Sequence, residues 1–221
     1  MKTLQPNRLV KSTLLLLCCS FAFAASSAWA TLVTWSLNPT GVNANVGSSS
    51  ADFTVGIYTI TARGYDSPST PHELYFKNLG AGERGLGLVG TVNNELQVNP
   101  LNFIQLDLTS ILALGFTNGQ ISVGSVQSGE SFSLYGSNTL GLLGTKLNVT
   151  PYGSTFDEQL ISVPSFGTYK FISVVAAAVD VLPVMFQATI VPIPEAASVI
   201  PVLCLVVAAT ALEIRRRRAM V

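Results

Sequence analysis

The chain has little of the chemistry that enzymes and metal sites usually need: one histidine, His72, and three cysteines in 221 residues. The cysteines (Cys18, Cys19 and Cys204) all fall in apolar segments at the two ends, so residues 31–193 contain none. That central region must therefore be stable without disulfides. One histidine and no cysteine do not supply the usual zinc ligand set, so no zinc site is expected there.

Charged residues are also scarce, at 11%, and their balance of 12 basic and 12 acidic residues conceals an asymmetry. Seven of the basic residues lie in the terminal segments: Lys2, Arg8, Lys11 and Arg215–Arg218. Residues 31–193 keep 5 basic and 10 acidic residues, a formal charge of −5. Nucleic-acid binding needs a basic surface, so this class of function is not expected.

The first 30 residues have the three-part order of a secretory signal peptide. A basic start is followed by an apolar stretch over residues 14–25 and by Ala28-Trp29-Ala30. Signal peptidase accepts small side chains at the positions of Ala28 and Ala30, so we expect cleavage before Thr31 and export of the rest. An uncleaved anchor is the alternative.

The other end of the chain combines a short polar tag, an apolar run and a basic stop. Pro194-Glu195-Ala196 leads into residues 196–214, and Arg215, Arg216, Arg217 and Arg218 follow. Nineteen residues of helix span about 28 Å, the thickness of a bilayer's hydrocarbon core. The sequence predicts one transmembrane helix in membrane lipid, with the arginines in the cytoplasm and the body outside. A buried core helix is the alternative.

This C-terminal order resembles the PEP-CTERM sorting signal of exopolysaccharide-producing Gram-negative bacteria. The resemblance implies that exosortase, a membrane sorting enzyme, reads Pro194 and Glu195 and that Arg215–Arg218 act as the stop. It also implies anchoring in the inner membrane before sorting, and the cell surface or extracellular matrix afterwards. The family's usual tripeptide is Pro-Glu-Pro, whereas Ala196 stands in third place here, so a plain transmembrane anchor stays open.

Between these signals, residues 31–193 read as one domain of short strands. Alternating apolar runs are broken by Gly, Asn, Ser and Pro. In one run Phe53, Val55 and Ile57 would share a face, and Thr109–Leu114 is a helical turn that Gly115 ends. An antiparallel β-sandwich of jelly-roll type is expected. The ten predicted strands are 32–37, 52–63, 73–77, 95–98, 103–108, 120–126, 131–135, 160–163, 169–175 and 184–191.

Parts of this body resemble galactose-binding-like jelly rolls, namely residues 131–138 with 141–145, and 169–173 with 179–182. The resemblance implies the jelly-roll fold, and it suggests carbohydrate contact and a structural calcium. Segments 74–78, 85–95 and 103–107 resemble the bodies of other PEP-CTERM surface proteins, whose function is mostly unassigned.

Calcium prefers oxygen ligands, and carboxylates and amides are spread along the body. They show no EF-hand spacing, so a site would have to be assembled from distant segments, and solvated surface charge is the alternative. The candidate ligands are Asp66, Glu73, Glu83, Asn93, Asn94, Glu95, Asp107 and Asp180.

Catalytic and nucleotide-binding patterns are weak. Gly80–Gly85 and Gly85–Gly90 both match G-x-G-x-x-G, but no helix follows, so a mobile glycine-rich loop between strands is expected. His72 is interpreted as a solvated loop residue without a serine nucleophile motif. Asp157 and Glu158 are adjacent and, with Glu130, do not make a glycosidase pair.

Exposed aromatic rings would mark a sugar-binding platform. Among the candidates Trp35, Tyr58, Tyr65, Tyr75, Tyr135 and Tyr152, we expect Tyr65 and Tyr152 to be exposed in turns and Trp35 and Tyr135 to lie in the core. The leading hypothesis is a non-enzymatic exported protein of the bacterial surface or exopolysaccharide matrix. A calcium-supported, lectin-like module on a plain membrane anchor is the alternative.

Overall fold

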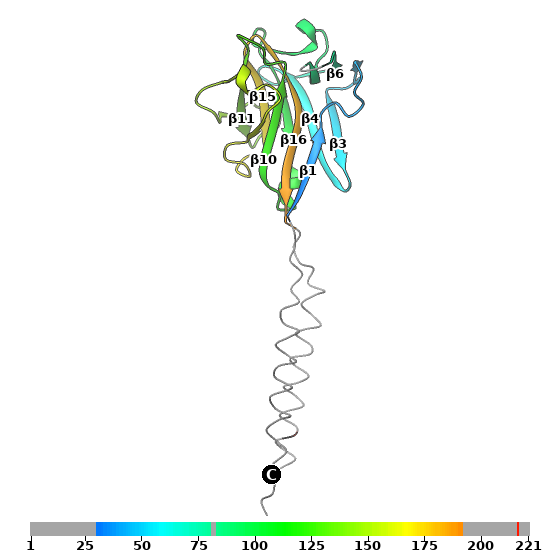
Figure 1. Cartoon of the computed structure of the whole chain (residues 1–221), viewed down its shortest axis with the longest axis vertical. Coiled ribbons are helices and arrows are strands. Elements are labelled where there is room, and N and C mark those ends of the chain that lie inside the picture. Colours follow the sequence, from blue (N-terminus) through cyan, green and yellow to red (C-terminus); the bar gives the residue numbers. More distant parts are fainter. Residues whose placement is uncertain (1–29, 81–82, 192–215, 217–221) are drawn as a thin grey trace, which may run out of the picture. The chain divides into compact units, whose positions relative to one another are not determined.

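Two antiparallel sheets face each other across one apolar core, which makes the body an all-β sandwich (Figure 1). This computed structural model describes residues 30–80, 83–191 and Arg216. The first sheet has the order β1 (Thr31–Ser36), β16 (Asp180–Ile190), β10 (Thr117–Gly124) and β14 (Leu160–Ser162), and β8 (Leu96–Gln97) also pairs with β16.

The second sheet is larger. Its order is β12 (Thr145–Lys146), β11 (Ser131–Ser137), β15 (Phe171–Ala178), β9 (Asn102–Asp107), β4 (Tyr58–Asp66) and β3 (Ser50–Val55). Two short strands extend it: β13 (Tyr152–Gly153) pairs with β11, and β5 (Thr70–His72) pairs with β4.

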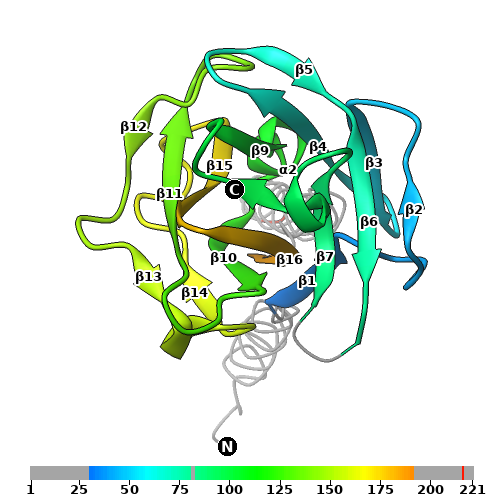
Figure 2. The same cartoon turned by 90° about the horizontal axis from the view of Figure 1, so that it is seen from above.

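A third, small sheet closes one side of the sandwich (Figure 2). It consists of β2 (Ala44–Asn45), β6 (Leu74–Asn78) and β7 (Arg84–Leu88). Phe76 of β6 packs edge-on against Phe53 of β3, with ring centroids 6.3 Å apart. The described helices are short: α2 (Thr109–Ala113) and the 3-10 turns η1 (Val92–Asn94) and η2 (Ser154–Phe156).

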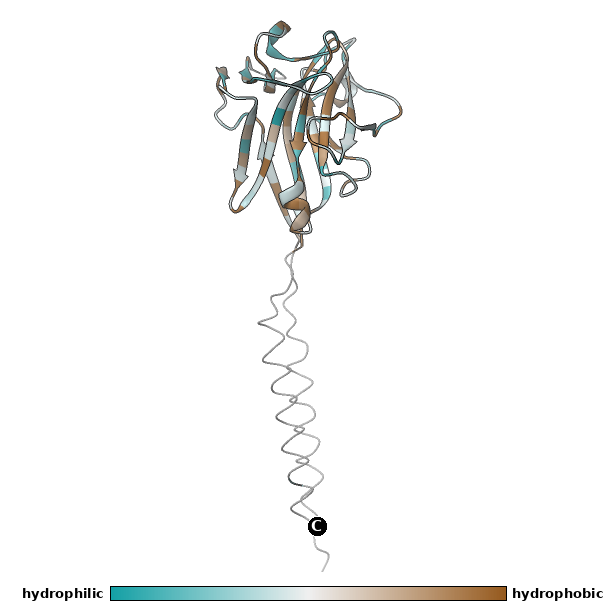
Figure 3. Cartoon of the chain, turned by 180° about the vertical axis from the view of Figure 1, so that it is seen from behind, coloured by the Kyte–Doolittle hydropathy of each residue, from teal (hydrophilic) through white to brown (hydrophobic). Residues whose placement is uncertain are grey.

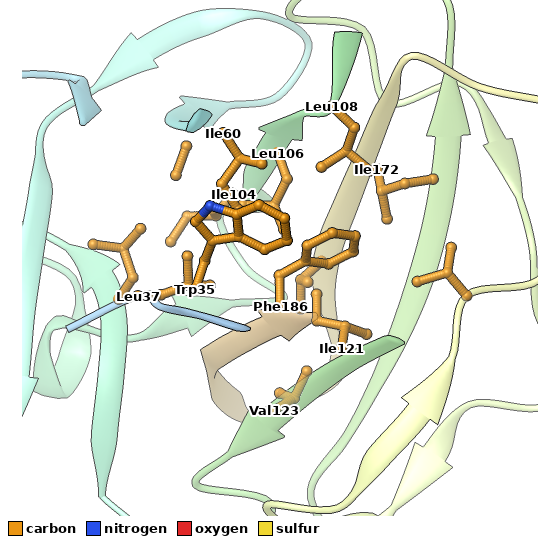
Figure 4. Packing of buried hydrophobic residues seen from close by; sticks show 14 of the residues in the cluster. Trp35, Leu37, Ile60, Ile104, Leu106, Leu108, Ile121, Val123, Ile172 and Phe186 are labelled. Atoms are coloured by element: carbon orange, nitrogen blue, oxygen red, sulfur yellow. The ribbon is translucent and has the colours of Figure 1, made fainter. Parts of the chain in front are cut away.

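Strand alternation builds the core, as the banded hydropathy of the strands shows (Figure 3). Trp35 of β1 is fully buried beside Phe186 of β16, with ring centroids 5.8 Å apart (Figure 4). Its indole Nε1 donates a hydrogen bond to the carbonyl of Tyr58 in the opposite sheet, at 3.1 Å. Trp35 therefore ties the two sheets together while its only polar atom stays satisfied.

Strand β9 is buried on both faces because residues 139–144 cover the outside of the second sheet. The buried Gln105 amide donates to the Leu142 carbonyl at 3.0 Å and accepts from the Gly141 amide at 2.8 Å. Tyr65 stacks on Phe103 under the same cover. The loop thus converts an outer sheet face into a second, smaller apolar cluster.

The predicted all-β class is confirmed, and each predicted strand overlaps at least one observed strand. The helical turn is also confirmed, with Gly115 at a φ of +82° directly after it. The single strand expected over 52–63 is wrong: it is the β3–β4 hairpin, turning at Gly56 and Ile57. Ile57 therefore lies in the turn, 84% exposed, and does not share the face of Phe53, whereas Val55 follows Phe53 on the same face of β3 and is 39% exposed.

Residues Ala30–Val191 form the compact unit that carries all these strands. Its two ends lie together, because Thr31 of β1 pairs with Ile190 of β16. Among the residues described, no helix has the length and apolar character needed to cross a membrane. The predicted signal peptide, apart from Ala30, and the predicted helix 196–214 lie outside the described residues, as do Ala28, Pro194, Glu195, Arg215, Arg217 and Arg218.

Candidate functional site

The proposed calcium ligands divide into separate groups. Glu83, Asn93, Glu95 and Asp180 gather around Lys77, where the third sheet meets β8 and β16. Asp107 lies elsewhere, paired with Arg63 at 3.1 Å. The remaining candidates serve other contacts: Asp66 pairs with His72, Glu73 lies near the same histidine, and the Asn94 side chain accepts a hydrogen bond from the Gly90 amide.

Lys77 is the centre of the first group, which we call the Lys77 cluster: Lys77, Glu83, Glu95, Glu130 and Asp180. Its ammonium Nζ contacts the Glu83 carboxylate at 2.9 Å and also binds the Glu95 carboxylate. The Lys77 and Glu95 side chains are only 3% and 2% exposed. Burial disfavours the lysine's charge, but the hydrogen bonds and charges of Glu95 and Glu83 outweigh it and raise the pKa of Lys77.

The acidic members of the cluster outnumber its one cation. Burial raises the pKa of Glu95 against the opposing hydrogen bond and charge of Lys77. Burial, together with the hydrogen bond and charge of Asp180, also raises the pKa of Glu130, although the Gln127 amide opposes this shift. Asp180 accepts a further hydrogen bond from the Asn93 amide at 3.3 Å. Glu95 and Glu130 therefore hold their protons more tightly than free glutamates do.

These residues do not fit a calcium ion. The Lys77 ammonium occupies the position between Glu83 and Glu95 that a cation would take. Over the described part of the body, which omits residues 81 and 82 beside Glu83, no three Asp, Glu, His or Cys side chains are arranged as ligands of a common metal. The second oxygen of Glu95, Oε2, is buried and makes no hydrogen bond within that part.

His72 is not a solvated loop residue. It lies on the edge strand β5, and its side chain is only 20% exposed. Nδ1 contacts Asp66 Oδ1 at 2.8 Å, and Nε2 donates to the Val89 carbonyl at 2.7 Å. Burial alone would lower the pKa of His72, but these two hydrogen bonds and the charges of Asp66 and Glu73 raise it overall. Both ring nitrogens are occupied, so neither is free to accept a proton from a serine.

The expected glycine-rich loop is wrong for residues 84–88, which form the buried strand β7. Its glycines allow close backbone approach: a Cβ on Gly85 would lie 2.6 Å from the Pro183 carbonyl oxygen, and one on Gly87 would lie 1.8 Å from that of Asn94. The motif therefore packs a strand against β16 and η1 and does not open a helix toward a phosphate.

The aromatic residues expected to be exposed are packed. Tyr65 is 7% exposed and stacks on Phe103 at 5.3 Å, so its prediction is wrong. Tyr152 is half-buried between Phe132 and Phe156. Trp35 lies in the core, as predicted.

Asp157 and Glu158 have different partners in the structure. Asp157 accepts a hydrogen bond from the Val126 amide at 3.0 Å, whereas Glu158 pairs with Arg84 at 3.3 Å. Each carboxylate is engaged by a different segment of the chain.

An open groove of about 650 Å³ lies on the first sheet, where the register of β10 shifts between Thr117 and Gln120. The groove lining carries no charge and includes Asn118, Gln120, Ser162, Phe166 and Thr189. At the edge of the groove, a row of polar side chains crosses the four strands β1, β16, β10 and β14. Gln187 is paired in register with Thr34 on one side and with Gln120 on the other, and Gln120 is paired with Ser162. The Gln187 amide donates to Gln120 at 2.6 Å.

Sequence reasoning missed this groove because its side chains come from three strands and two loops. The β-bulge, which no local motif announces, leaves the Phe166 ring half-buried over Gly119, where a Cβ would lie 2.2 Å from the ring. Comparison with known protein families, curated proteins and solved structures finds no match for this chain.

Proposed function

We propose that this chain is an exported, non-enzymatic protein of the bacterial surface or exopolysaccharide matrix, sorted through its PEP-CTERM-like C-terminal signal. The observation that carries the proposal is where the folded body begins and ends. Strand β1 starts at Thr31, directly after the expected signal-peptidase site, and β16 ends at Ile190, four residues before Pro194. Both expected cuts thus fall outside the strands and spare the sandwich.

In this proposal signal peptidase reads Ala28 and Ala30, the exosortase-like enzyme reads Pro194 and Glu195, and Arg215–Arg218 hold the tail in the membrane. The sandwich is of jelly-roll type. The strand order of both sheets supports this, because sequence neighbours such as β9 and β10 lie in opposite sheets. The body's titratable groups also support a structural role, since Lys77, His72 and Arg63 are each engaged by carboxylates.

Intact mass of the mature protein from a host with exosortase tests the sorting step. The unaltered chain should begin at Thr31 and lack the apolar tail. Glu195→Ala should retain the tail and stay in the membrane fraction, while Glu158→Ala, a change in the body, should be processed normally. If Glu195→Ala leaves mass and location unchanged, the sorting proposal fails and a plain transmembrane anchor replaces it.

A second function, carbohydrate binding, is favoured by the uncharged groove. Amide and hydroxyl groups beside an aromatic ring suit a neutral sugar, and the body's charge of −5 disfavours a polyanion. Binding to a neutral polysaccharide should weaken in Gln120→Ala and persist in EDTA, because the Lys77 cluster does not fit calcium. Binding that disappears in EDTA, or that is unchanged in Gln120→Ala, would contradict this assignment.

A further inference from the structure

One end of the sandwich, which we call the exit end, gathers exposed apolar side chains where the chain leaves the body. Its residues are Leu32, Val55, Ile57, Leu114 and Val191, and their exposed fractions are 56%, 39%, 84%, 47% and 52%. Thr31 pairs with Ile190 and Thr117 pairs with Thr189, which places the starts of β1 and β10 beside the end of β16 (Figure 1).

The β3–β4 turn and α2 belong to the same end. Tyr58, which follows Ile57, packs edge-on against Phe116 with ring centroids 4.9 Å apart, and Phe116 lies two residues after Leu114. The Ser110 hydroxyl of α2 donates to the Thr59 carbonyl. Exposed apolar residues from four separate segments therefore meet at one end.

The segments that carry these apolar residues have no charged side chains. Residues 31–36, 53–58, 109–116 and 186–191 contain no Asp, Glu, Lys, Arg or His. Charged residues lie beside them: Asp52 comes three residues before Val55, and the Lys170 carbonyl accepts a hydrogen bond from the Leu108 amide just before α2. The Lys77 cluster lies at the other end of β16, because Asp180 begins that strand and Ile190 ends it. Eleven strand residues span about 35 Å. The exit end and the Lys77 cluster thus lie at opposite ends of β16.

Chain length brings the exit end close to lipid if residues 196–214 span the bilayer, a condition that rests on the proposed function. Four residues lie between Val191 and Ala196, and the five steps from one to the other cover at most about 18 Å in a fully extended chain. The headgroup layer occupies roughly 5–7 Å of this span. The body therefore cannot stand far from the membrane.

We propose that the exit end rests on the lipid bilayer surface, with Ile57 and Leu114 in the headgroup region. Apolar side chains at this depth leave water, and the segments that carry them bring no charged side chain that would have to lose its hydration there. The contact would hold the body upright before sorting and keep Pro194 and Glu195 at the membrane surface, where an embedded enzyme can reach them.

Spin labels on the full-length, signal-processed chain in phosphatidylcholine vesicles test this contact. The body contains no cysteine, so in a Cys204→Ala background Ile57→Cys and Leu114→Cys each place one label at the exit end. Val179→Cys is the matched control, since Val179 is 59% exposed and lies between β15 and β16 at the opposite end. Labelled Cys204 in the unaltered chain reports on the anchor itself.

We expect labels at 57 and 114 to be several-fold more accessible to oxygen than to an aqueous nickel chelate, and the label at 179 to show the reverse. Aqueous labels at 57 and 114 beside a lipid-buried label at 204 would overturn the surface contact and leave the anchor intact. An aqueous label at 204 would overturn the anchor and the contact together. If the labels at position 57 are exposed to water and broaden one another's spectra, the exit end mediates self-association, and the lipid contact is overturned.

Discussion

Lys77 is the residue whose replacement should disturb the body most through electrostatics. Lys77→Met leaves the buried Glu95 carboxylate without its cation, and breaking a buried ion pair in this way destabilises by about 3–5 kcal/mol. The free energy of unfolding in urea, followed by Trp35 fluorescence, measures the loss. Lys146→Met, at an exposed lysine, should stay within about 0.5 kcal/mol of the unaltered body.

Adding Glu95→Gln to Lys77→Met should recover part of the loss, because the unpaired charge is then gone. Equal stability of Lys77→Met and Lys146→Met would show that the Lys77 cluster does not stabilise the fold.

A second prediction at the residue scale concerns pH. The pKa values of Glu95, Glu130, His72 and Lys77 are all raised in the folded body. A raised folded pKa means that the folded state holds its proton more tightly, so the stabilisation is complete below the unfolded pKa and lost as pH rises through the folded one. For the two glutamates and His72 this window begins at the ordinary values of 4.5 and 6.5.

The midpoint of urea unfolding should therefore fall as the pH is raised from about 5 to about 8. Glu130→Gln should flatten the acidic part of this dependence, because the glutamine amide does not titrate. A body that becomes more stable over the same range would disprove the assignment.

The sequence could indicate the composition of the Lys77 cluster only in part. Glu83, Asn93, Glu95 and Asp180 were identified because carboxylates and amides suit a cation. The sequence does not predict the role of Lys77, because this residue lies within a predicted strand, 18 residues from Glu95. No local motif indicates an ion pair between residues that far apart. Tyr65 was misplaced for a related reason: the cover over it comes from residues 139–144, a distant loop.

At the scale of elements, β7 depends on glycines for its close packing. Gly87→Ala would drive a Cβ against the Asn94 carbonyl oxygen, a backbone atom that cannot swing away. We expect destabilisation of about 1–3 kcal/mol, the range for overpacking. Gly153→Ala is the matched control, since its nearest atom would lie 3.9 Å away. Thermal unfolding should separate the two variants, and equal melting temperatures would argue against the close approach.

Elements with regular alternation were predictable, whereas those made by glycines were not. In β16 the inward residues Val184, Phe186, Ala188 and Ile190 alternate as a strand should, and the strand was expected. Gly85 and Gly87 have no side chains that could alternate between faces, so the sequence of β7 predicts a loop. Gly56, with a φ of +61°, sits inside an apolar run and breaks it into a hairpin without any polar marker.

At the scale of the whole molecule, two features of the body lie at opposite ends of β16. The ion pairs of Lys77 lie near its start, and the exposed apolar side chains of the exit end lie where the chain enters and leaves the body. Composition alone indicated an acidic body of 5 basic and 10 acidic residues. It could not indicate the exit end, because the four segments that form it are distant in sequence and meet only after the sandwich has formed.

The position of the N-terminal cut decides whether the mature body can fold. Trp35 and Leu37 are both fully buried, and loss of one buried tryptophan side chain costs about 3–5 kcal/mol, against a typical total stability of about 5–15 kcal/mol. Residues 31–193 should therefore unfold cooperatively with a melting temperature close to that of the mature protein. A chain starting at residue 38, which lacks β1, should not fold.

Residues 31–191 provide the control, because removing two residues beyond β16 takes away no strand pairing. Circular dichroism in the aromatic region distinguishes these outcomes, and a folded chain from residue 38 would show that β1 is dispensable and that the start of the body is not fixed by its core.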